Sequence, residues 1–224
     1  MIIMPSNKKH IAFALLMALP FFPDVFYLSL AVIGTTIIDF DHNVKINNLF
    51  VMTLFGILLT LLLYILKLPL FLGLLIIFMA ILFLICKDRG FMHSLIGITL
   101  STVILTILIL GLYFLIYNFT INKMVILVLI LAFLGFLALN IRIVGPYIVL
   151  VVIGLLLLPN TVISIYSVFG ALFLGFLSHV TMDLFTPSGV ALFSPLFKRK
   201  FHKITGLIIL IAWIIFALFY LIFI

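Results

Sequence analysis

The sequence predicts an all-α integral membrane protein, a polytopic bundle of transmembrane helices. Of its 224 residues, 68% are hydrophobic and only 8% are charged, and the mean hydropathy is +1.61. In soluble domains about half of the residues are apolar. Several windows of roughly 20 residues carry no charge, which is the length that a helix needs to cross a hydrocarbon core about 30 Å thick. Runs such as GILLTLLLYIL and VILVLILAFL show no alternation of apolar and polar residues, which argues against a β-barrel.

The first apolar segment, residues 11–38, is interrupted by the motif PFFPD, which contains Pro20, Pro23 and Asp24. Proline breaks a helix, and aspartate favours a turn or a helix cap. Two arrangements remain open for this segment. It forms either one kinked span or two half-length helices in a re-entrant hairpin.

Apolar windows between turn signals predict seven further spans. They cover residues 47–66, 69–86, 93–117, 123–139, 143–158, 161–185 and 203–223. The window at 143–158 is short enough to be re-entrant itself. Because no repeat or linker is visible, we expect one domain over residues 1–224, with a broken helix or hairpin at 11–38 and a bundle that carries the site at 39–224.

The positive charges favour the hairpin. With a hairpin, ten of the 12 Lys and Arg residues fall on one membrane face and two on the other, whereas a single crossing gives eight and four. The ten are Lys8, Lys9, Lys45, Lys87, Arg89, Arg142, Lys198, Arg199, Lys200 and Lys203, and the two are Lys67 and Lys123. Because Lys and Arg accumulate on the cytoplasmic side of membrane proteins, we predict that the first face is cytoplasmic.

The few acids and histidines are clustered. The chain has five acids, all of them aspartate, and five histidines. Apart from Asp24 and His202, they lie in the stretches KKHIAF, IIDFDHN, KDRGFMHSLIG and GFLSHVTMDLFTPSGV, which all reach the same face in the predicted topology. An aspartate within a transmembrane helix costs about 2.5 to 3.5 kcal/mol near the bilayer centre. A divalent cation held by imidazole and carboxylate groups would offset that cost.

His179 and Asp183 are four residues apart, and therefore lie on one face of a helix, where they can share an ion. Ala171 and Gly175 continue this stripe with small side chains, which let a neighbouring helix approach closely.

The other candidates have competing interpretations. His93 is either a ligand or a helix cap, and His10 is either a ligand or a solvated interfacial residue. Asp88 is expected to pair with Arg89 or Lys87. Ser94 and Ser178 are expected to bond to helix backbone rather than to act as nucleophiles.

Four motifs carry a resemblance to a known family. KHIAF, IDFDHN, DRGFMHS and GFLSHVTMDLFTPSGVALFSP correspond in order to G-H, P-D-I-D-H, H-R-G-x-T-H-S and G-x-x-S-H-x-x-x-D-x-x-T-P-x-G-V followed by a nearby proline. With these motifs the chain resembles the prokaryotic YdjM-like family of inner-membrane proteins, described as LexA-binding, membrane-associated, metal-dependent hydrolases. The resemblance implies a set of metal ligands made of His10, Asp39, Asp41, His42, His93, His179 and Asp183. Asp88 and Met92 depart from the family pattern, in place of a histidine and a threonine.

The expected function is metal-dependent hydrolysis of a phosphoester or lipid-like substrate at the cytoplasmic interface of the inner membrane. One or two divalent ions, zinc first and manganese, iron or magnesium as alternatives, would activate a water. Asp41 or Asp183 would accept its proton, and Arg89 would bind a phosphate oxygen. The absence of glutamate excludes an HExxH protease.

Two other functions compete with hydrolysis: a divalent-metal transporter or channel, and a non-catalytic metal-binding membrane protein. The expected partners are membrane lipids, and no nucleic-acid-binding motif is visible.

Overall fold

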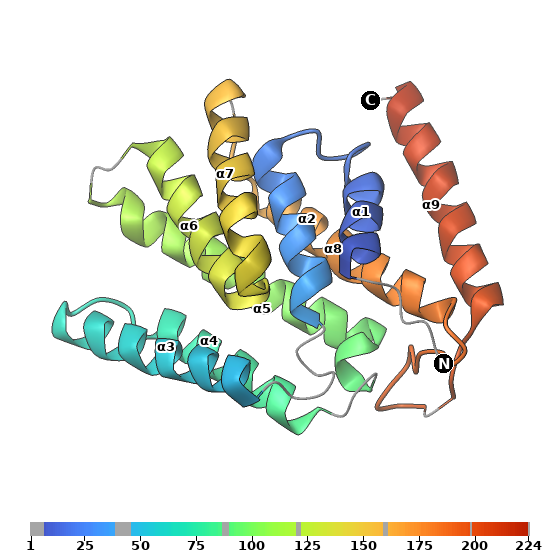
Figure 1. Cartoon of the computed structure of the whole chain (residues 1–224), viewed down its shortest axis with the longest axis horizontal. Coiled ribbons are helices and arrows are strands. Elements are labelled where there is room, and N and C mark those ends of the chain that lie inside the picture. The colour runs from blue at the N-terminus through green and yellow to red at the C-terminus, as the bar shows by residue number, and fades with distance from the viewer. Residues whose placement is uncertain are drawn as a thin grey trace.

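A computed structural model describes residues 7–38, 46–86, 90–119, 122–158, 161–197 and 199–223. Within these ranges the regular structure consists of nine α-helices, a short 3-10 turn and one isolated bridge between Val190 and Phe201 (Figure 1). The elements are α1 (Asn7–Ala18), α2 (Val25–Ile37), α3 (Ile46–Ile65), α4 (Phe71–Ile85), η2 (Phe91–His93), α5 (Leu95–Tyr117), α6 (Lys123–Ala138), α7 (Ile141–Leu157), α8 (Ile165–Leu184) and α9 (Lys203–Phe223). The prediction of an all-α bundle is confirmed.

The seven predicted windows each contain one helix, with ends that differ by at most four residues. Three helices, α5, α8 and α9, are long and apolar enough to cross a membrane by length and composition. The described apolar stretches of α2, α3, α4, α6 and α7 are shorter. The predicted count of seven crossings is therefore not confirmed and stays a prediction.

Residues 7–38 form two helices that lie side by side, joined by a turn, rather than one kinked span. Asp24 caps α2, because its Oδ1 accepts a hydrogen bond of 2.8 Å from the Phe26 amide. The 12 and 13 residues of α1 and α2 correspond to lengths of about 18 and 20 Å. Each helix is thus shorter than the hydrocarbon core. The hairpin therefore brings the start of α1 and the end of α2 to the same end of the bundle.

The other end of the bundle is held together by polar contacts around Asp24. Thr161 Oγ1 donates to both carboxylate oxygens of Asp24, at 3.1 and 2.9 Å. The Tyr27 hydroxyl donates to the Val162 carbonyl, and Lys123 Nζ donates to the Thr161 carbonyl. These bonds join the α1–α2 turn, the start of α6 and the segment before α8. They explain why α8 begins at Ile165 rather than at residue 161, since the residues before it are used for these contacts.

Helix α8 is the centre of the bundle and packs against α1, α2, α5 and α9. Its approach to α2 is backbone to backbone. A β-carbon at Gly175 would lie 2.3 Å from the Ala31 carbonyl oxygen, and one at Gly34 would lie 2.6 Å from the Leu172 carbonyl oxygen. Small residues permit such contacts between membrane helices. The predicted role of Gly175 in close helix packing is confirmed.

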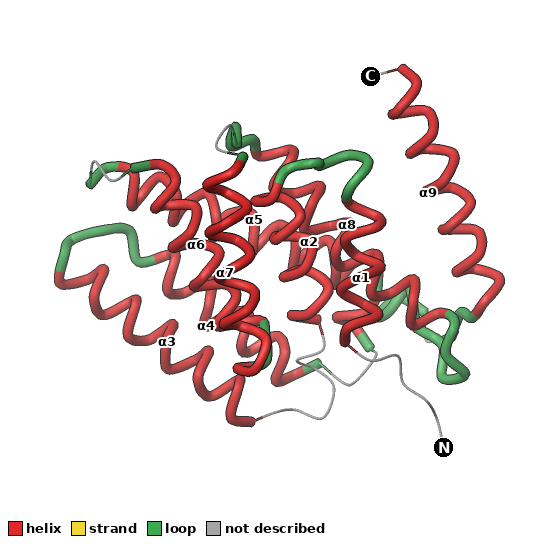
Figure 2. The backbone as a smooth tube through the Cα atoms, turned by 45° about the horizontal axis from the view of Figure 1, so that its top comes forward, coloured by secondary structure: helices red, strands yellow, loops and turns green. Residues whose placement is uncertain are grey.

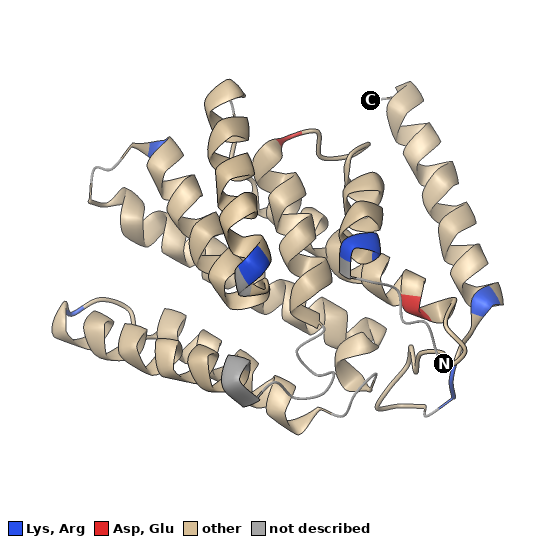
Figure 3. Ribbon diagram, in the orientation of Figure 1, with Lys and Arg blue, Asp and Glu red and all other residues tan. Residues whose placement is uncertain are grey.

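The outside of the bundle is apolar, as a lipid-facing surface requires. Large side chains such as Leu58, Leu62 and Leu84 on α3 and α4 are more than half exposed. Helix α9 stands apart from the other helices (Figure 2), and only Gly206 and Ala217 are buried along it. The charged residues that the structure describes lie at helix ends and in connecting segments (Figure 3).

The contact between α2 and α8 predicts a clear difference between two glycine substitutions. Gly175→Ala forces a methyl group into the backbone of α2, and we expect it to lower the free energy of unfolding by about 1 to 3 kcal/mol. Gly145→Ala on α7 is the control, because its β-carbon would meet nothing within 4 Å outside its own helix backbone and its chain neighbours. Its methyl group would meet only the ring of the following Pro146, so that change should cost less than Gly175→Ala. Denaturation of both variants in detergent measures the difference, and equal stability of the two would contradict the packing.

Candidate metal centre

Four of the predicted ligands meet at the end of the bundle opposite to Asp24. His10 lies in the first turn of α1, His93 ends the η2 turn before α5, and His179 and Asp183 lie in the last two turns of α8. Their side chains are buried, with exposed fractions of 4%, 1%, 1% and 3% respectively. Three imidazoles and a carboxylate from distant parts of the sequence thus share one site.

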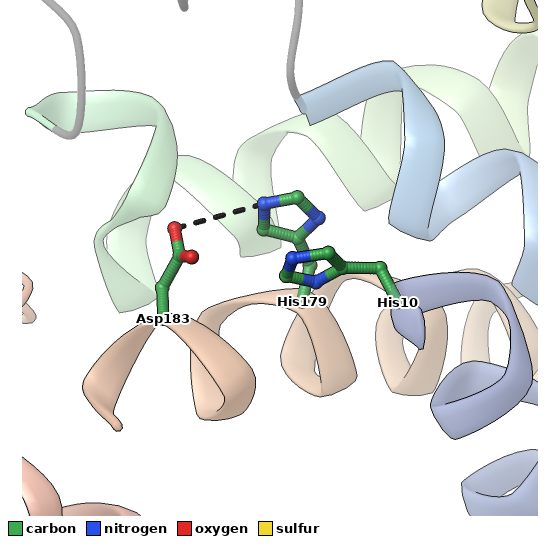
Figure 4. Close-up of side chains that lie close together, drawn as sticks. All are labelled: His10, His179 and Asp183. Carbon is green, nitrogen blue, oxygen red and sulfur yellow. Dashed lines mark ion pairs between the residues drawn. The ribbon is translucent and has the colours of Figure 1, made fainter. Parts of the chain in front are cut away.

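The nitrogen and oxygen atoms of these residues are close enough to share an ion. Asp183 Oδ2 lies 3.5 Å from His93 Nε2 and 3.7 Å from His179 Nε2. The rings of His10 and His179 are stacked, with centroids 4.1 Å apart, and Asp183 lies beside them (Figure 4). One ligand atom from each of His10, His179 and Asp183 lies within 4.8 Å of the other two.

The two contacts of Asp183 with His93 and His179 fit a shared metal better than direct hydrogen bonds. Two atoms bound to one zinc ion at 2.0 to 2.2 Å are separated by at most about 4.4 Å. The two contacts of Asp183, at 3.5 and 3.7 Å, satisfy this limit and exceed the usual length of an N–H···O bond. The donor set of imidazole nitrogen and carboxylate oxygen is also the set that zinc and similar ions prefer.

The orientation of His179 is set by the backbone of α2. His179 Nδ1 lies 2.7 Å from the carbonyl oxygen of Thr35. Because a carbonyl oxygen can only accept, Nδ1 carries the hydrogen. In the neutral ring Nε2 is then a lone-pair donor on the side of Asp183, as in metal sites where the second ring nitrogen bonds to backbone. The close α2–α8 contact through Gly175, one turn before His179, makes this bond possible.

The backbone also favours a cation at this position. Asp183 lies in the last turn of α8, and Thr35 lies near the end of α2. The carboxyl end of a helix carries a partial negative charge, which destabilises a carboxylate and attracts a positive ion. Burial of Asp183 also destabilises its charged carboxylate unless a positive charge lies beside it.

His93 does not cap α5, so that competing interpretation is wrong. The cap is Ser94, whose Oγ accepts from the Gly97 amide at 3.0 Å and donates to the Phe91 carbonyl at 2.6 Å. A β-carbon at Gly97 would lie 1.9 Å from the Phe91 carbonyl oxygen, so only glycine lets the η2 turn fold onto α5. The turn places the buried His93 side chain next to Asp183.

The expectation that both serines bond to backbone is confirmed. Ser178 Oγ donates to the Gly175 carbonyl at 2.7 Å, as Ser94 does to Phe91. Both hydroxyls are fully buried.

The turn-rich segment after α8 is packed beside the centre. Thr186 Oγ1 donates to the Asp183 carbonyl at 2.7 Å, and the Leu95 amide donates to the Leu192 carbonyl at 2.8 Å. Gly189 has a φ of +61°, and Val190 and Phe201 exchange two backbone bonds. The segment therefore fixes the end of α8 relative to the start of α5.

Two contacts of the centre were missed by sequence reasoning. Thr35 takes part through its carbonyl oxygen, which any residue has, so no side-chain signal marks it. Thr186 follows Asp183 by three residues, and its hydroxyl bonds within the turn.

Several predicted site residues lie outside the described residues. These are Asp39, Asp41 and His42, within 39–45, and Asp88 and Arg89, within 87–89. Their proposed roles stay predictions.

Comparison with protein families gave a match over nearly the whole chain. The sequence model of the family described as YdjM inner membrane protein matches residues 4–224, nearly the whole chain. No match was found among curated proteins or among solved structures.

The cap at the start of α5 predicts that two buried serines, Ser94 just before the helix and Ser101 within it, respond differently to replacement by alanine. Ser94→Ala removes a helix cap, and we expect it to lower the free energy of unfolding by about 0.5 to 2 kcal/mol. Ser101→Ala is the matched control, because Ser101 Oγ is buried without a hydrogen-bond partner among the described residues, so its removal should not destabilise. Denaturation midpoints of the two variants test this, and an equal loss in both would refute the cap.

Proposed function

The chain belongs to the YdjM inner membrane protein family, and from that premise we propose that it is a membrane-embedded, metal-dependent hydrolase of phosphoester or lipid-like substrates. One observation carries the proposal. His93 Nε2 and His179 Nε2 both lie close to the same buried oxygen of Asp183, and the ring of His10 is stacked on that of His179. A site of this kind suits one or two divalent ions. Zinc is the first choice for this donor set, and manganese, iron and magnesium are alternatives.

The residues have distinct roles in this proposal. His10, His93 and His179 would hold the divalent ion, and the Thr35 carbonyl fixes the ring of His179. When bound, the ion would supply a water acidified towards neutral pH. Asp183 offers two oxygens, so it can bind with one and accept a proton with the other. Asp41 is the alternative proton acceptor and Arg89 the phosphate-binding residue, both proposed from the sequence.

The position of the ligands favours hydrolysis over transport. Transport sites lie near the bilayer midplane, in helices that are broken half way. Here His10, His179 and Asp183 lie within the first or last two turns of their helices, and His93 precedes α5. A site at the bundle end would lie near the headgroups of the bilayer rather than near its midplane.

A cytoplasmic location of the site is supported by the described charges. Lys8, Lys9 and Lys203 lie at the starts of α1 and α9, at the end of the bundle that carries the site. Lys123 bonds to the Thr161 carbonyl at the opposite end. This asymmetry follows the positive-inside rule.

The test combines metal analysis with an activity screen. Protein purified in detergent is expected to contain one or two equivalents of a divalent metal and to hydrolyse a phosphoester or phospholipid. His179→Ala and Asp183→Asn should lower metal affinity at least about 10-fold and abolish turnover. His202→Ala is the control, since this histidine is exposed and outside the cluster.

Two outcomes would contradict parts of the proposal. Metal-free wild-type protein that takes up no added zinc would refute the metal centre. Stoichiometric metal without turnover on any phosphoester would refute hydrolysis and favour transport or a structural metal.

A further inference from the structure

We propose that an anionic phospholipid binds between α8 and α9, with its phosphate in a basic pocket at the start of α9 and one acyl chain in an adjoining apolar groove. This site lies on the side of α8 that faces away from the histidine cluster. The inference goes beyond the hydrolase proposal and does not depend on a metal.

The apolar groove exists because α9 touches the bundle at two separate levels. Near its start, a β-carbon at Gly206 would lie 2.9 Å from the Phe185 ring. Further along, the rings of Phe216 and Tyr220 pack on Phe21, at centroid distances of 5.4 and 5.1 Å. Between these levels lies a cavity of about 990 Å³.

One face of α8 forms the floor of this groove. Gly170, Phe173, Leu174 and Leu177 line it, at positions i, i+3, i+4 and i+7 of the helix. From α9, Trp213 lines the opposite wall, and its Nε1 donates to the Met17 carbonyl at 3.1 Å. The volume is at the upper end of ligand pockets, about 300 to 1,000 Å³, and the lining is almost entirely apolar.

The basic pocket has a volume of about 610 Å³ and is lined by Arg199, Lys200 and Lys203. The Arg199 guanidinium carbon lies 6.0 Å from the centroid of the Phe201 ring, a contact that holds it at the pocket. Among the residues that the structure describes, none that lines the pocket is acidic. Arginine and lysine together are the side chains that recognise phosphate.

The pocket and the groove adjoin at Thr205 in the first turn of α9, which lines both. A soluble phosphate would fill only the basic pocket and leave the apolar groove empty. A neutral lipid would fill the groove but would bring no net negative charge to the three cations of the pocket. An anionic phospholipid satisfies both parts.

The exposed loop that precedes Arg199 in the sequence indicates that the basic pocket lies in the headgroup layer of the membrane. Phe193, Leu196 and Phe197 have exposed fractions of 40%, 68% and 64%, and they come just before the cations in the sequence. Exposed apolar side chains beside Lys and Arg are typical of segments that insert into the interface of anionic membranes. The lipid source is therefore the surrounding bilayer.

Trp213 provides a direct probe, because it is the only tryptophan in the chain and it lines the groove. The purified full chain is reconstituted in phosphatidylcholine nanodiscs that contain a few per cent of phosphatidylglycerol with a brominated acyl chain, which quenches tryptophan on contact. A parallel series contains brominated phosphatidylcholine at the same mole fraction. We expect stronger quenching by the anionic lipid.

Two variants separate the two parts of the site. Arg199→Gln combined with Lys203→Gln should weaken apparent binding of the anionic lipid by roughly 25-fold, about fivefold for each cation, and leave quenching by phosphatidylcholine unchanged. Ala212→Phe adds a ring to an exposed position of the groove and should lower quenching by the anionic lipid. Lys67→Gln combined with Arg142→Gln removes the same charges elsewhere on the surface and should change neither.

Three results would overturn the inference. They are equal quenching of the wild type by the two lipids, an equal loss in the control pair and the Arg199/Lys203 pair, and unchanged quenching in Ala212→Phe. Chelator-treated protein should give the same quenching as untreated protein, so the outcome is distinguishable from any failure of the hydrolase proposal.

Discussion

The buried carboxylate of Asp183 is the constraint around which the centre is built. Its exposed fraction is 3%, and it lies at the negative end of the α8 dipole, so two effects oppose its charge. Three imidazoles surround it, with His10 and His179 stacked at 4.1 Å. If protonated imidazoles supplied the positive charge, two like charges would lie in contact whenever both of these rings were protonated. A single divalent ion supplies two charges at one point, which is why the arrangement favours a metal.

The packing of α2 on α8 determines whether these groups can meet. Lipid tails give apolar side chains little reason to leave the bilayer, so membrane helices associate through close backbone contact at small residues. Gly34 and Gly175 provide that contact beside the bond between Thr35 and His179, because Gly34 directly precedes Thr35 and Gly175 lies one turn before His179. The α1–α2 hairpin is equally necessary, because a single kinked span would carry His10 to the other end of the bundle. Asp24 and Thr161 hold the turn of the hairpin there.

Features with a local signal, and the ligand set implied by the family resemblance, were predicted from the sequence, whereas other contacts between distant segments were not. Apolar windows predicted seven helices, the distribution of positive charge favoured the hairpin over a kinked span, and the four-residue spacing predicted that His179 and Asp183 share a face. The η2 turn depends on the fit of Phe91 against Gly97, and the Thr35 carbonyl has no side-chain signature. The separation of α9 from α8 depends on contacts of Phe21 with Phe216 and Tyr220, almost 200 residues away, which no periodicity indicates.

Helix α8 connects the two proposed sites, because one of its faces carries ligands of the metal centre and the opposite face lines the lipid groove. The inward face carries Gly175, His179 and Asp183, and the outward face lines the groove beneath α9. Two short links join them. Leu95 lines the groove and follows His93 by two residues, and Thr186 lines the basic pocket while its hydroxyl donates to the Asp183 carbonyl. The two sites therefore approach each other at this end of α8. They share none of the side chains proposed to hold the metal or the lipid, so each can be occupied without the other.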